Sequence, residues 1–375
     1  MAEWTYPAGA ANTSLVNARW AKLMLAQFMQ DTWFLRMASK EDTGMIQILD
    51  DLQKHAGDSV IYGSSQLLTG AGVLDLNTLT GNEEAPSTYG DQLYVHELAH
   101  ATLLVGPISN QRVLFDRRKI GRNRLADWYA ARVDHGAANQ LAGYTPQSDT
   151  RYTGLQSPTA VSGATATAGG TGRQILPAAV SDAASIGSSN TFAVTFWDTA
   201  VLRAKSLTAG IRPLKVAGRV LYVGVMHPSQ VTDMRQNTNT GQWFDIQKAA
   251  MTGGDIGDNP IFWQAIGMYH GVLLHENPRI TNSVANAGTA VSNTKRALFC
   301  GAQAATLAFG RSEGDSQKFR WLEELRDFGR QIGIGVSAIW GLKKVVFNST
   351  DFGVIVIDTY GVDTDTLGAA STNAE

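Results

Sequence analysis

The distribution of charge between residues 55 and 132 constrains the fold more than any other feature of this sequence. From His55 to Gln111 there is no lysine or arginine, yet the stretch holds six acidic residues. From Arg112 to Arg132 the sign inverts, with seven basic residues and two acidic ones. The acidic stretch is dotted with Gly, Ser and Thr and has short β-prone pieces, which predicts a long two-stranded excursion with little packing of its own.

The basic segment that follows predicts a long helix over residues 109–142. Pro107 and Ser109 mark its start, with Ser109 as the N-cap, and Gly143 closes it at the C′ position. Apolar residues recur between them at three- and four-residue steps. An unbroken helix of this length would measure about 50 Å at 1.5 Å per residue. Such a length is typical of a structural spine.

The rest of the chain predicts an α+β fold without an internal repeat. Residues 15–37 have the periodicity of an amphipathic N-terminal helix. Residues 145–190 are rich in Gly, Ser, Thr and Ala, which predicts a surface insertion or a flexible segment. Strands are expected at 192–197, 219–226, 271–274, 333–339 and 353–357, and helices at 228–236, 242–252 and 317–329.

Composition narrows the class of protein. At 375 residues the chain exceeds a single core, so more than one sub-domain is expected. A net charge of −2 argues against a protein whose main task is to bind nucleic acid. Only 17% of residues are charged, as expected where much of the surface faces other subunits. The single cysteine, Cys300, and the lack of a secretory or membrane-spanning stretch predict a soluble protein made in a cytoplasm.

One motif points to a different function. His96-Glu97-Leu98-Ala99-His100 matches H-E-x-x-H, which on a helix binds zinc through its histidines and uses the glutamate as general base. No third ligand stands at the expected spacings, since Leu103 and Gly106 occupy the metzincin positions and no glutamate follows until Glu276. The surrounding sequence predicts a strand or a short turn. A zinc peptidase therefore stays as the alternative, and no cofactor, metal or catalytic residue is assigned.

Several strings resemble the major capsid proteins of the coliphage N-four type, tailed phages whose shells have the Hong Kong 97 capsid fold. The strings are Leu79-Thr80-Gly81-Asn82-Glu83-Glu84 with Asp91-Gln92-Leu93, Gln111 to Arg118 leading into 125–134 and 139–143, Tyr222 to Gln230, and Gly341 to Asn348 with 351–355. Their order and spacing cover residues 45 to 362. In that family the segment matching 92–102 carries Gln-Leu-Arg-His-Ala, so His100 fits the pattern while His96 and Glu97 are local substitutions.

The resemblance implies a domain plan. Residues 1–57 would form an N-terminal arm, 58–107 an extended β-hairpin loop, and 108–143 the spine helix of a peripheral domain. Residues 144–316 would form an axial domain that contains the 145–190 insertion, and 317–375 would return to the peripheral domain. The implied function is a major capsid protein of the virion, a structural protein and not an enzyme. A cellular shell protein of the same fold is a further alternative.

The implied partners are copies of the chain itself, in hexamers and pentamers of an icosahedral shell assembled in the host bacterial cytoplasm. Scaffolding, portal and decoration proteins and non-specifically contacted double-stranded DNA would be further partners, and no membrane is involved. We expect the acidic loop of one subunit to lie along the basic spine of the next, with charge setting the register. The candidate contact residues are Asp75, Glu83, Glu84, Arg117, Arg118, Lys119, Arg122 and Arg124.

Overall fold

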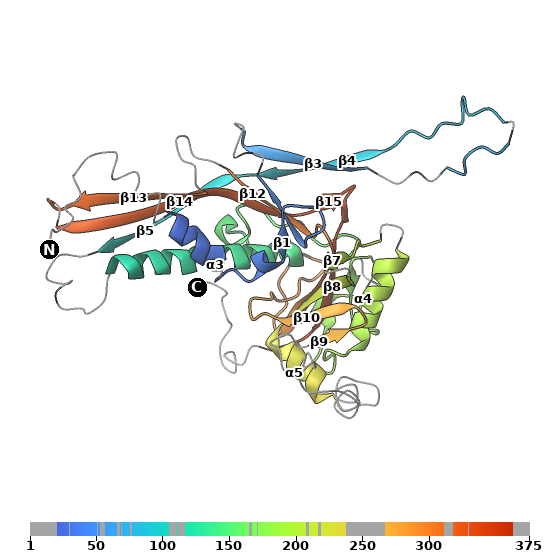
Figure 1. The fold of residues 1–375 in the computed structure, drawn as a ribbon. Helices are drawn as coiled ribbons and strands as arrows, with labels where there is room; N and C mark the ends of the chain where they lie inside the picture. The colour runs from blue at the N-terminus through green and yellow to red at the C-terminus, as the bar shows by residue number, and fades with distance from the viewer. Residues whose placement is uncertain are drawn as a thin grey trace, which may run out of the picture.

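The computed structural model combines helices with two large β-sheets, and a two-stranded hairpin projects from this body (Figure 1). It describes residues 21–29, 31–50, 52, 57–65, 68, 70–75, 77–104, 111, 117–164, 167–170, 172–207, 210–216, 219–237, 267–310, 318–328 and 330–362. Within these residues no helix combines the length and the apolar character needed to span a bilayer.

The six-stranded sheet joins strands from distant parts of the chain. Its order is β1-β2-β12-β14-β13, and β5 pairs with the opposite edge of β14. The strands are β1 (Ala38–Ser39), β2 (Ile46–Leu49), β5 (His96–Leu104), β12 (Ala305–Phe309), β13 (Phe319–Arg326) and β14 (Gln331–Lys344). Residues 331–340 of β14, together with β13 and β5, form a three-strand extension that reaches away from the rest of the body (Figure 1).

The two faces of this sheet are covered differently, because successive side chains of a strand point to opposite sides. Even-numbered residues of β14 belong to the large core beneath the sheet, which includes helix α3 (Arg117–Ala142), and we call their side the helix face. The Tyr129 hydroxyl on α3 donates to the carbonyl oxygens of Leu98 and Val336, at 2.7 and 3.0 Å. The odd-numbered residues define the opposite side, the hairpin face.

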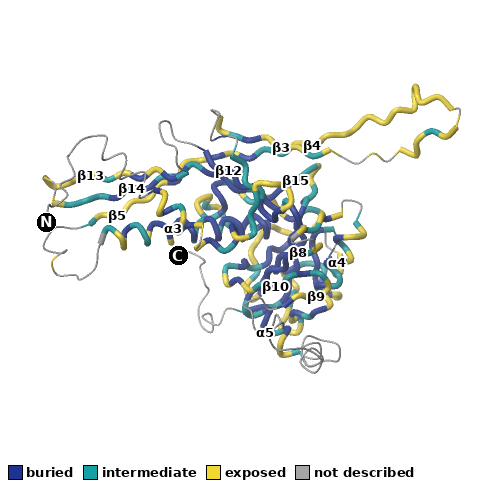
Figure 2. Tube along the Cα trace, viewed as in Figure 1, coloured by how far each residue is buried: buried dark blue, intermediate teal, exposed yellow. Residues whose placement is uncertain are grey.

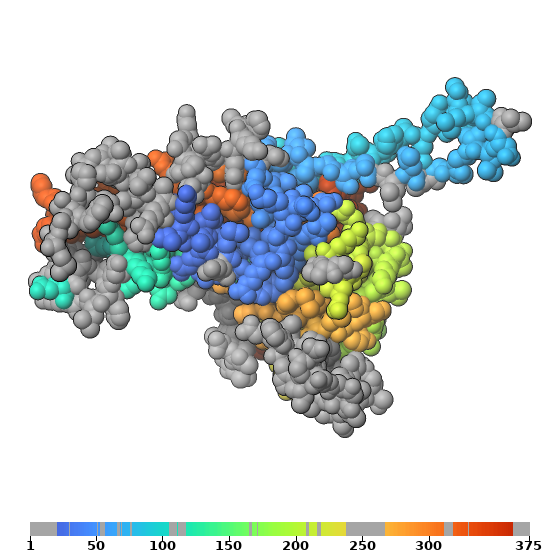
Figure 3. All heavy atoms as spheres, viewed as in Figure 1, coloured from blue at the N-terminus to red at the C-terminus, as the bar shows by residue number. Residues whose placement is uncertain are grey.

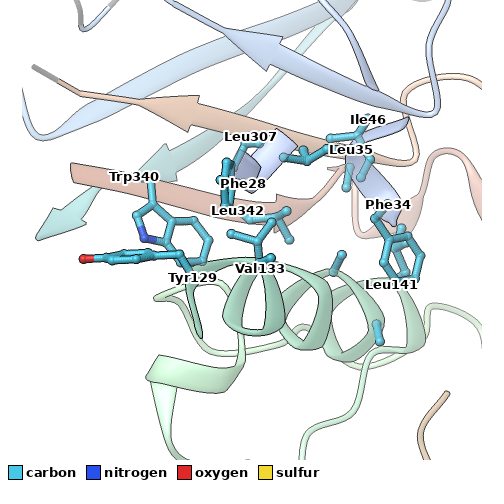
Figure 4. Close-up of a cluster of buried hydrophobic side chains, with 14 of the residues drawn as sticks. Phe28, Phe34, Leu35, Ile46, Tyr129, Val133, Leu141, Leu307, Trp340 and Leu342 are labelled. Carbon is cyan, nitrogen blue, oxygen red and sulfur yellow. The ribbon is translucent and has the colours of Figure 1, made fainter. Parts of the chain in front are cut away.

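The core on the helix face also holds the N-terminal segment. Phe28, from the helix at 21–29, and Phe34, from the 3-10 turn η1 (Phe34–Met37), are fully buried beside α3 and the sheet (Figure 4). Each buried aromatic side chain of this size contributes roughly 1.5–3 kcal/mol by leaving water. Packing on the core, more than helix propensity, therefore fixes this segment in place.

The hairpin consists of β3 (Ser59–Ser65) and β4 (Thr88–Tyr94), which pair antiparallel from Ser59 opposite Tyr94 to Ser65 opposite Thr88. Val60 and Leu93 pack near Ile339 on the hairpin face. After Val95 the same strand continues as β5, so one stretch of chain serves both the hairpin and the six-stranded sheet. Beyond β3 and β4 the described loop residues project away from the body and are almost all exposed (Figures 2 and 3).

The seven-stranded sheet forms the second half of the body, in the order β6-β17-β11-β8-β10-β9 with β7 beside β8. Its strands are β6 (Gln174–Ile175), β7 (Leu214–Val216), β8 (Arg219–Met226), β9 (Gly267–Tyr269), β10 (Val272–Glu276), β11 (Thr294–Cys300) and β17 (Val354–Tyr360). Helices α4 (Thr195–Ser206) and α5 (Pro228–Gln236) share its core, in which Trp197 and Phe299 are fully buried. Short elements complete the chain: η3 (Thr150–Tyr152), η4 (Ala183–Ser185), β15 (Val346–Phe347) and β16 (Thr350–Asp351).

The spine helix and its predicted end are confirmed from residue 117 onward. Gly143 has φ of +60° and sits at C′, where a β-carbon would come within 2.8 Å of the Thr159 carbonyl oxygen. The amide of Tyr144 donates to the Asn139 carbonyl, and Arg296 donates to the carbonyl of Ala142. These bonds satisfy carbonyl groups that every helix end leaves open. Most of the predicted first two turns lie outside the described residues.

Three expectations are wrong in their secondary structure or packing. Residues 192–197 were expected as a strand, but α4 begins at Thr195, and Trp197 faces the core at helical spacing with Ala200 and Val201. Residues 317–329 were expected as a helix, but β13 occupies 319–326. The segment 145–190 is irregular as expected, but it is no loose insertion, because residues such as Leu155 and Ile175 are buried in the two cores. The predicted helix at 242–252 lies outside the described residues.

Candidate subunit-contact surfaces

The base of the hairpin is fixed to the body through Asp91 of β4. Its Oδ1 accepts a hydrogen bond from Lys343 Nζ of β14 at 2.5 Å, and its Oδ2 accepts from the Tyr62 hydroxyl at 2.8 Å. The Val346 amide also donates to Oδ2, at 3.3 Å. Lys343 donates further to the Gln92 carbonyl. Because these donors fix the Asp91 carboxylate, the hairpin leaves the body in a fixed direction.

The hairpin loop, the described residues between β3 and β4, carries the three acidic candidates. Asp75 has φ of +51°, Glu83 accepts from the Gly81 amide at 2.7 Å, and Glu84 accepts from the Gly70 amide at 2.5 Å. The glutamates therefore shape the loop locally. The loop also carries apolar residues that no motif singles out, of which Leu68, Leu74 and Leu79 are each more than 60% exposed. Leucines spaced without helical or strand period gave no sequence signal.

The basic candidates lie on α3 near its described start. Arg118 pairs with Glu323 of β13 at 2.6 Å, and Arg124 pairs with Asp127 at 3.5 Å. Lys119 is exposed, and Arg122 bonds to the side chain of Asn123. Arg117 begins α3. The basic residues are thus gathered on one helix, and two of them have acidic partners within the subunit.

The acidic and basic candidates lie on opposite sides of the six-stranded sheet. α3 packs on the helix face, whereas the hairpin base packs on the hairpin face around Ile339 and Ala308. Figure 1 shows β3 and β4 on one side of the six-stranded sheet and α3 on the other, with the loop projecting beyond the sheet. Within one subunit the structure does not bring the two sets together. It places them on different surfaces of the molecule.

The hairpin face of the three-strand extension carries side chains that are exposed in the described part of the chain. Between residues 333 and 337 its middle strand contributes Gly333, Gly335 and Ser337, and on either side Ala99, Ala101, Leu103, Arg320, Leu322 and Glu324 are exposed. Leu322 and Leu103 are 51% and 44% exposed. Because glycine, alanine and serine rise little above the backbone, this is a shallow surface edged by two leucines. It lies on the same side of the sheet as the hairpin.

A second polar centre joins three parts of the chain. The buried Asp134 carboxylate of α3 accepts from the amides of Trp33 and Phe34, both at 3.1 Å, and from Arg279 at 2.5 Å. Burial raises the pKa of Asp134, although the amides of Trp33 and Phe34 and the charge of Arg279 act to lower it. Burial, with the nearby positive charges of Arg279 and Arg132, lowers the pKa of the adjacent His135 to about 4. The centre holds the N-terminal segment, the spine and the second half of the body together.

The H-E-x-x-H motif lies on a strand and not on a helix. It begins β5, so His96 and His100 are exposed on the helix face and Glu97 points to the hairpin face. At about 3.3 Å per residue the two histidines stand some 13 Å apart, which is too far to share a metal ion. His100 instead stacks on Trp128, with ring centroids 4.4 Å apart. Across the described parts of the chain no three His, Cys, Asp or Glu side chains gather in a way that could hold a metal.

Together these features define a class of protein. A body of mixed sheets crossed by a long helix, with a hairpin that extends past any surface of its own subunit, is built to make contacts between copies, and it has the Hong Kong 97-like capsid fold. The sequence model of the phage capsid protein family matches residues 10–363, and the chain belongs to that family. It is a major capsid protein of a phage and a part of the virion.

Individual relatives agree with this assignment. The major capsid protein of Pseudomonas phage KPP25 is 26% identical over 338 residues, which cover 83% of this chain and 86% of the relative. The capsid of Ralstonia phage GP4 is similar with a TM-score of 0.71 and 29% identity, covering 88% of this chain and 90% of that one. The capsid of cyanophage Pam1 has the same fold, with a TM-score of 0.67, 20% identity and coverage of 89% and 93%. Neither the peptidase nor the cellular shell alternative gains support.

Proposed function

We propose that the chain assembles into the hexamers and pentamers of an icosahedral shell around double-stranded DNA, and that its hairpin loop binds the neighbouring subunit. The observation that carries this is the contrast along the hairpin. Its base is held by Asp91 and Lys343, whereas its loop presents three leucines that are each more than 60% exposed. Exposed apolar residues at the end of a hairpin that is fixed at its base indicate a contact surface for another chain.

Geometry favours the hairpin face of the neighbour's three-strand extension as the receiving surface. Copies related by rotation about an axis through the shell wall keep the same face outward. A loop on the hairpin side of one subunit then meets the hairpin side of the next. That side offers Leu103 and Leu322 to the leucines of the loop, and Arg320 to its acids.

Charge alone favours a second receiving surface, the basic start of α3. The acidic residues Asp75, Glu83 and Glu84 complement Lys119, Arg122 and Arg124 in sign. Exposed ion pairs are worth only about 0–1 kcal/mol each, so they would set register while apolar contacts supply cohesion. The two surfaces belong to opposite faces of the sheet, which makes them separable by mutation.

The domain plan follows as part of this proposal. Residues 58–107 act as the extended loop, 108–143 as the spine of the peripheral domain, 144–316 as the axial domain, and 317–375 return to the peripheral domain after the N-terminal arm at 1–57. Assembly takes place in the host cytoplasm, with scaffolding, portal and decoration proteins as partners. The packaged DNA is contacted without sequence specificity.

The test is assembly of the purified chain, viewed by negative-stain electron microscopy over a range of concentration and salt. Shells, capsomers, tubes or sheets are expected for the natural sequence. Leu74→Asp with Leu79→Asp should reduce these assemblies at least tenfold while the subunit stays folded. The control is Leu202→Asp, because this leucine is also 65% exposed but belongs to α4 and not to the hairpin. Equal assembly by both variants would remove the loop from the contact.

A further inference from the structure

The guanidinium of Arg132, on α3, has two aromatic rings packed against it at the surface of the molecule. Its Cζ lies 3.8 Å from the ring centroid of Tyr152 in η3 and 5.1 Å from that of Trp128 in α3. His100 of β5 stacks on the same tryptophan, with ring centroids 4.4 Å apart. All four side chains are half-buried or exposed. Three separate segments of the chain thus fix the position of one positive charge.

The rings hold Arg132 without using its hydrogen-bond donors. Among the residues that the structure describes, its side chain makes these ring contacts and no hydrogen bond or ion pair. Asp149 lies near enough to interact with its charge, but both oxygens of that carboxylate accept from Arg151. A planar guanidinium that is fixed by rings and keeps its N–H donors is suited to bind two oxygens of one phosphate.

Charge is segregated between the two sides of the six-stranded sheet. Helix α3 carries six basic and two acidic side chains, and one of these acids, Asp134, is buried and paired with Arg279. The stretch from Asp58 to Glu97, most of which forms the hairpin and its loop, has six acids and no lysine or arginine. Figure 1 shows α3 on the side of the sheet away from β3 and β4. The net charge of −2 therefore sums a basic side and an acidic side.

The basic surface continues along α3 from Arg132 toward the start of the helix. Arg124, Trp128 and Arg132 follow one another at four-residue steps, so they form one row on the helix surface. The two arginines stand about 12 Å apart along the axis, at 1.5 Å per residue. The side chain of Arg124 is 80% exposed and shares a 3.5 Å ion pair with the exposed Asp127. The row therefore offers two accessible guanidinium groups, one of them held rigidly.

We infer that the surface around Arg124 and Arg132 binds the backbone of double-stranded DNA, with Arg132 donating to a phosphate. The inference rests on the proposed shell function, because copies related by axes through the shell wall turn the same side toward the packaged duplex. The basic side attracts a polyanion, whereas the acids of the other side repel it. Phosphate contacts carry no sequence information, so this surface binds any duplex. The competing occupant is the acidic hairpin loop of a neighbouring subunit.

The test measures how the unassembled full chain binds a fluorescein-labelled DNA duplex of random sequence, by anisotropy over a series of salt concentrations. Arg132→Ala should weaken binding about threefold to tenfold at low salt and reduce the slope of log K against log salt by about one. Arg132→Lys keeps the charge but loses the planar fork, so its affinity should fall between the two. The control is Arg326→Ala, an exposed arginine of β13 paired with Glu324, which should change neither quantity. Values for Arg132→Ala equal to those of this control would overturn the inference.

Assembly in the absence of DNA separates the two occupants. The double variant Arg124→Ala with Arg132→Ala should form DNA-free shells as abundantly as the natural chain, because its missing partner is absent from both samples. A loss of these shells of at least tenfold, in a variant that stays folded, would assign the surface to a neighbouring subunit and overturn the inference. Failure of the natural chain to form any assembly would instead count against the proposed function. Binding by the unassembled chain still decides the DNA site in that case, so the two failures differ.

Discussion

Lys343 and Asp91 tie the hairpin to the six-stranded sheet, with Nζ 2.5 Å from Oδ1 and both side chains mostly buried. The pair lies where β4 leaves the hairpin and approaches β14, on the side of the sheet away from α3. The hydroxyl of Tyr62 and the amide of Val346 occupy the second carboxylate oxygen. A loop that extends far from the body therefore has a fixed direction at its root.

The first prediction concerns this root. Asp91→Ala removes an acceptor of both Lys343 and Tyr62 in a largely buried place and should lower the free energy of unfolding by about 1–3 kcal/mol. Hydrogen exchange at the amides of β3 and β4 should speed up more than exchange in β11, and denaturant titration measures the stability. Arg151→Ala, which removes an exposed pair with Asp149, serves as the control and should change neither. Unchanged exchange in the hairpin would refute its anchoring by Asp91.

The second prediction concerns Asp134. Asp134→Ala removes the acceptor of Arg279 and of two backbone amides in a buried site, and we expect a loss of roughly 3–5 kcal/mol. Asp134→Asn keeps one oxygen acceptor and should lose less. Chemical denaturation gives both values, and limited proteolysis reports release of residues 21–37. If the alanine and asparagine variants are equally stable, the charge of Asp134 has no part in holding the segment.

The third prediction is a pH dependence. Because the pKa of His135 is lowered to about 4, the unfolded chain, with a value near 6.5, takes up this proton first as the pH falls. The contribution of neutral His135 is complete above pH 6.5 and is lost toward pH 4. After allowance for solvent screening it amounts to about 1 kcal/mol. His135→Gln should make the thermal midpoint depend less on pH across this range. Asp134, whose pKa is raised, contributes a pH dependence of the opposite sign.

The fourth prediction separates the two receiving surfaces for the loop. Reversing Lys119 and Arg124 to glutamate tests the helix face, and reversing Arg320 with Leu322→Asp tests the hairpin face. Arg117 and Arg118 are left unchanged, because Arg118 already forms an ion pair with Glu323 within the subunit. We expect only the hairpin-face variant to reduce particles in electron micrographs. The opposite result would assign the loop to the neighbour's α3.

The fifth prediction concerns the H-E-x-x-H motif. Strand geometry separates His96 from His100, so dialysis against a chelator should leave both assembly and thermal midpoint unchanged. His96→Ala should be neutral, whereas His100→Ala should cost up to about 1 kcal/mol through the lost stack on Trp128. Elemental analysis showing one zinc per chain, lost in His96→Ala, would revive the peptidase alternative.

Long and strongly patterned elements could be predicted from the sequence, and ambiguous short ones could not. The long helix, its Gly143 end and α5 follow from local chemistry; in α5 the N-cap His227 and Gln230 form a capping box, with Pro228 as the first helical residue. β13 fails as a prediction because its Glu, Leu and Arg residues favour a helix, while its burial alternates from Phe319 to Trp321. Pairing with β14 decided the outcome there, and a single sequence does not contain that information.

The contact candidates were predictable in charge but not in placement. The six acids and the basic helix are plain in the sequence, yet only the fold reveals that the hairpin base and the helix pack on opposite faces of one sheet.

The order β1-β2-β12-β14-β13 has a consequence for how the protein is made. β2 at 46–49 pairs with β12 at 305–308, and β5 pairs with residues that follow 331. At a synthesis rate of about 5–20 residues per second, β2 waits roughly 15–60 s on the ribosome for β12 and β14. During that time the edge of β2 that pairs with β12 has no partner, so the six-stranded sheet closes late in synthesis.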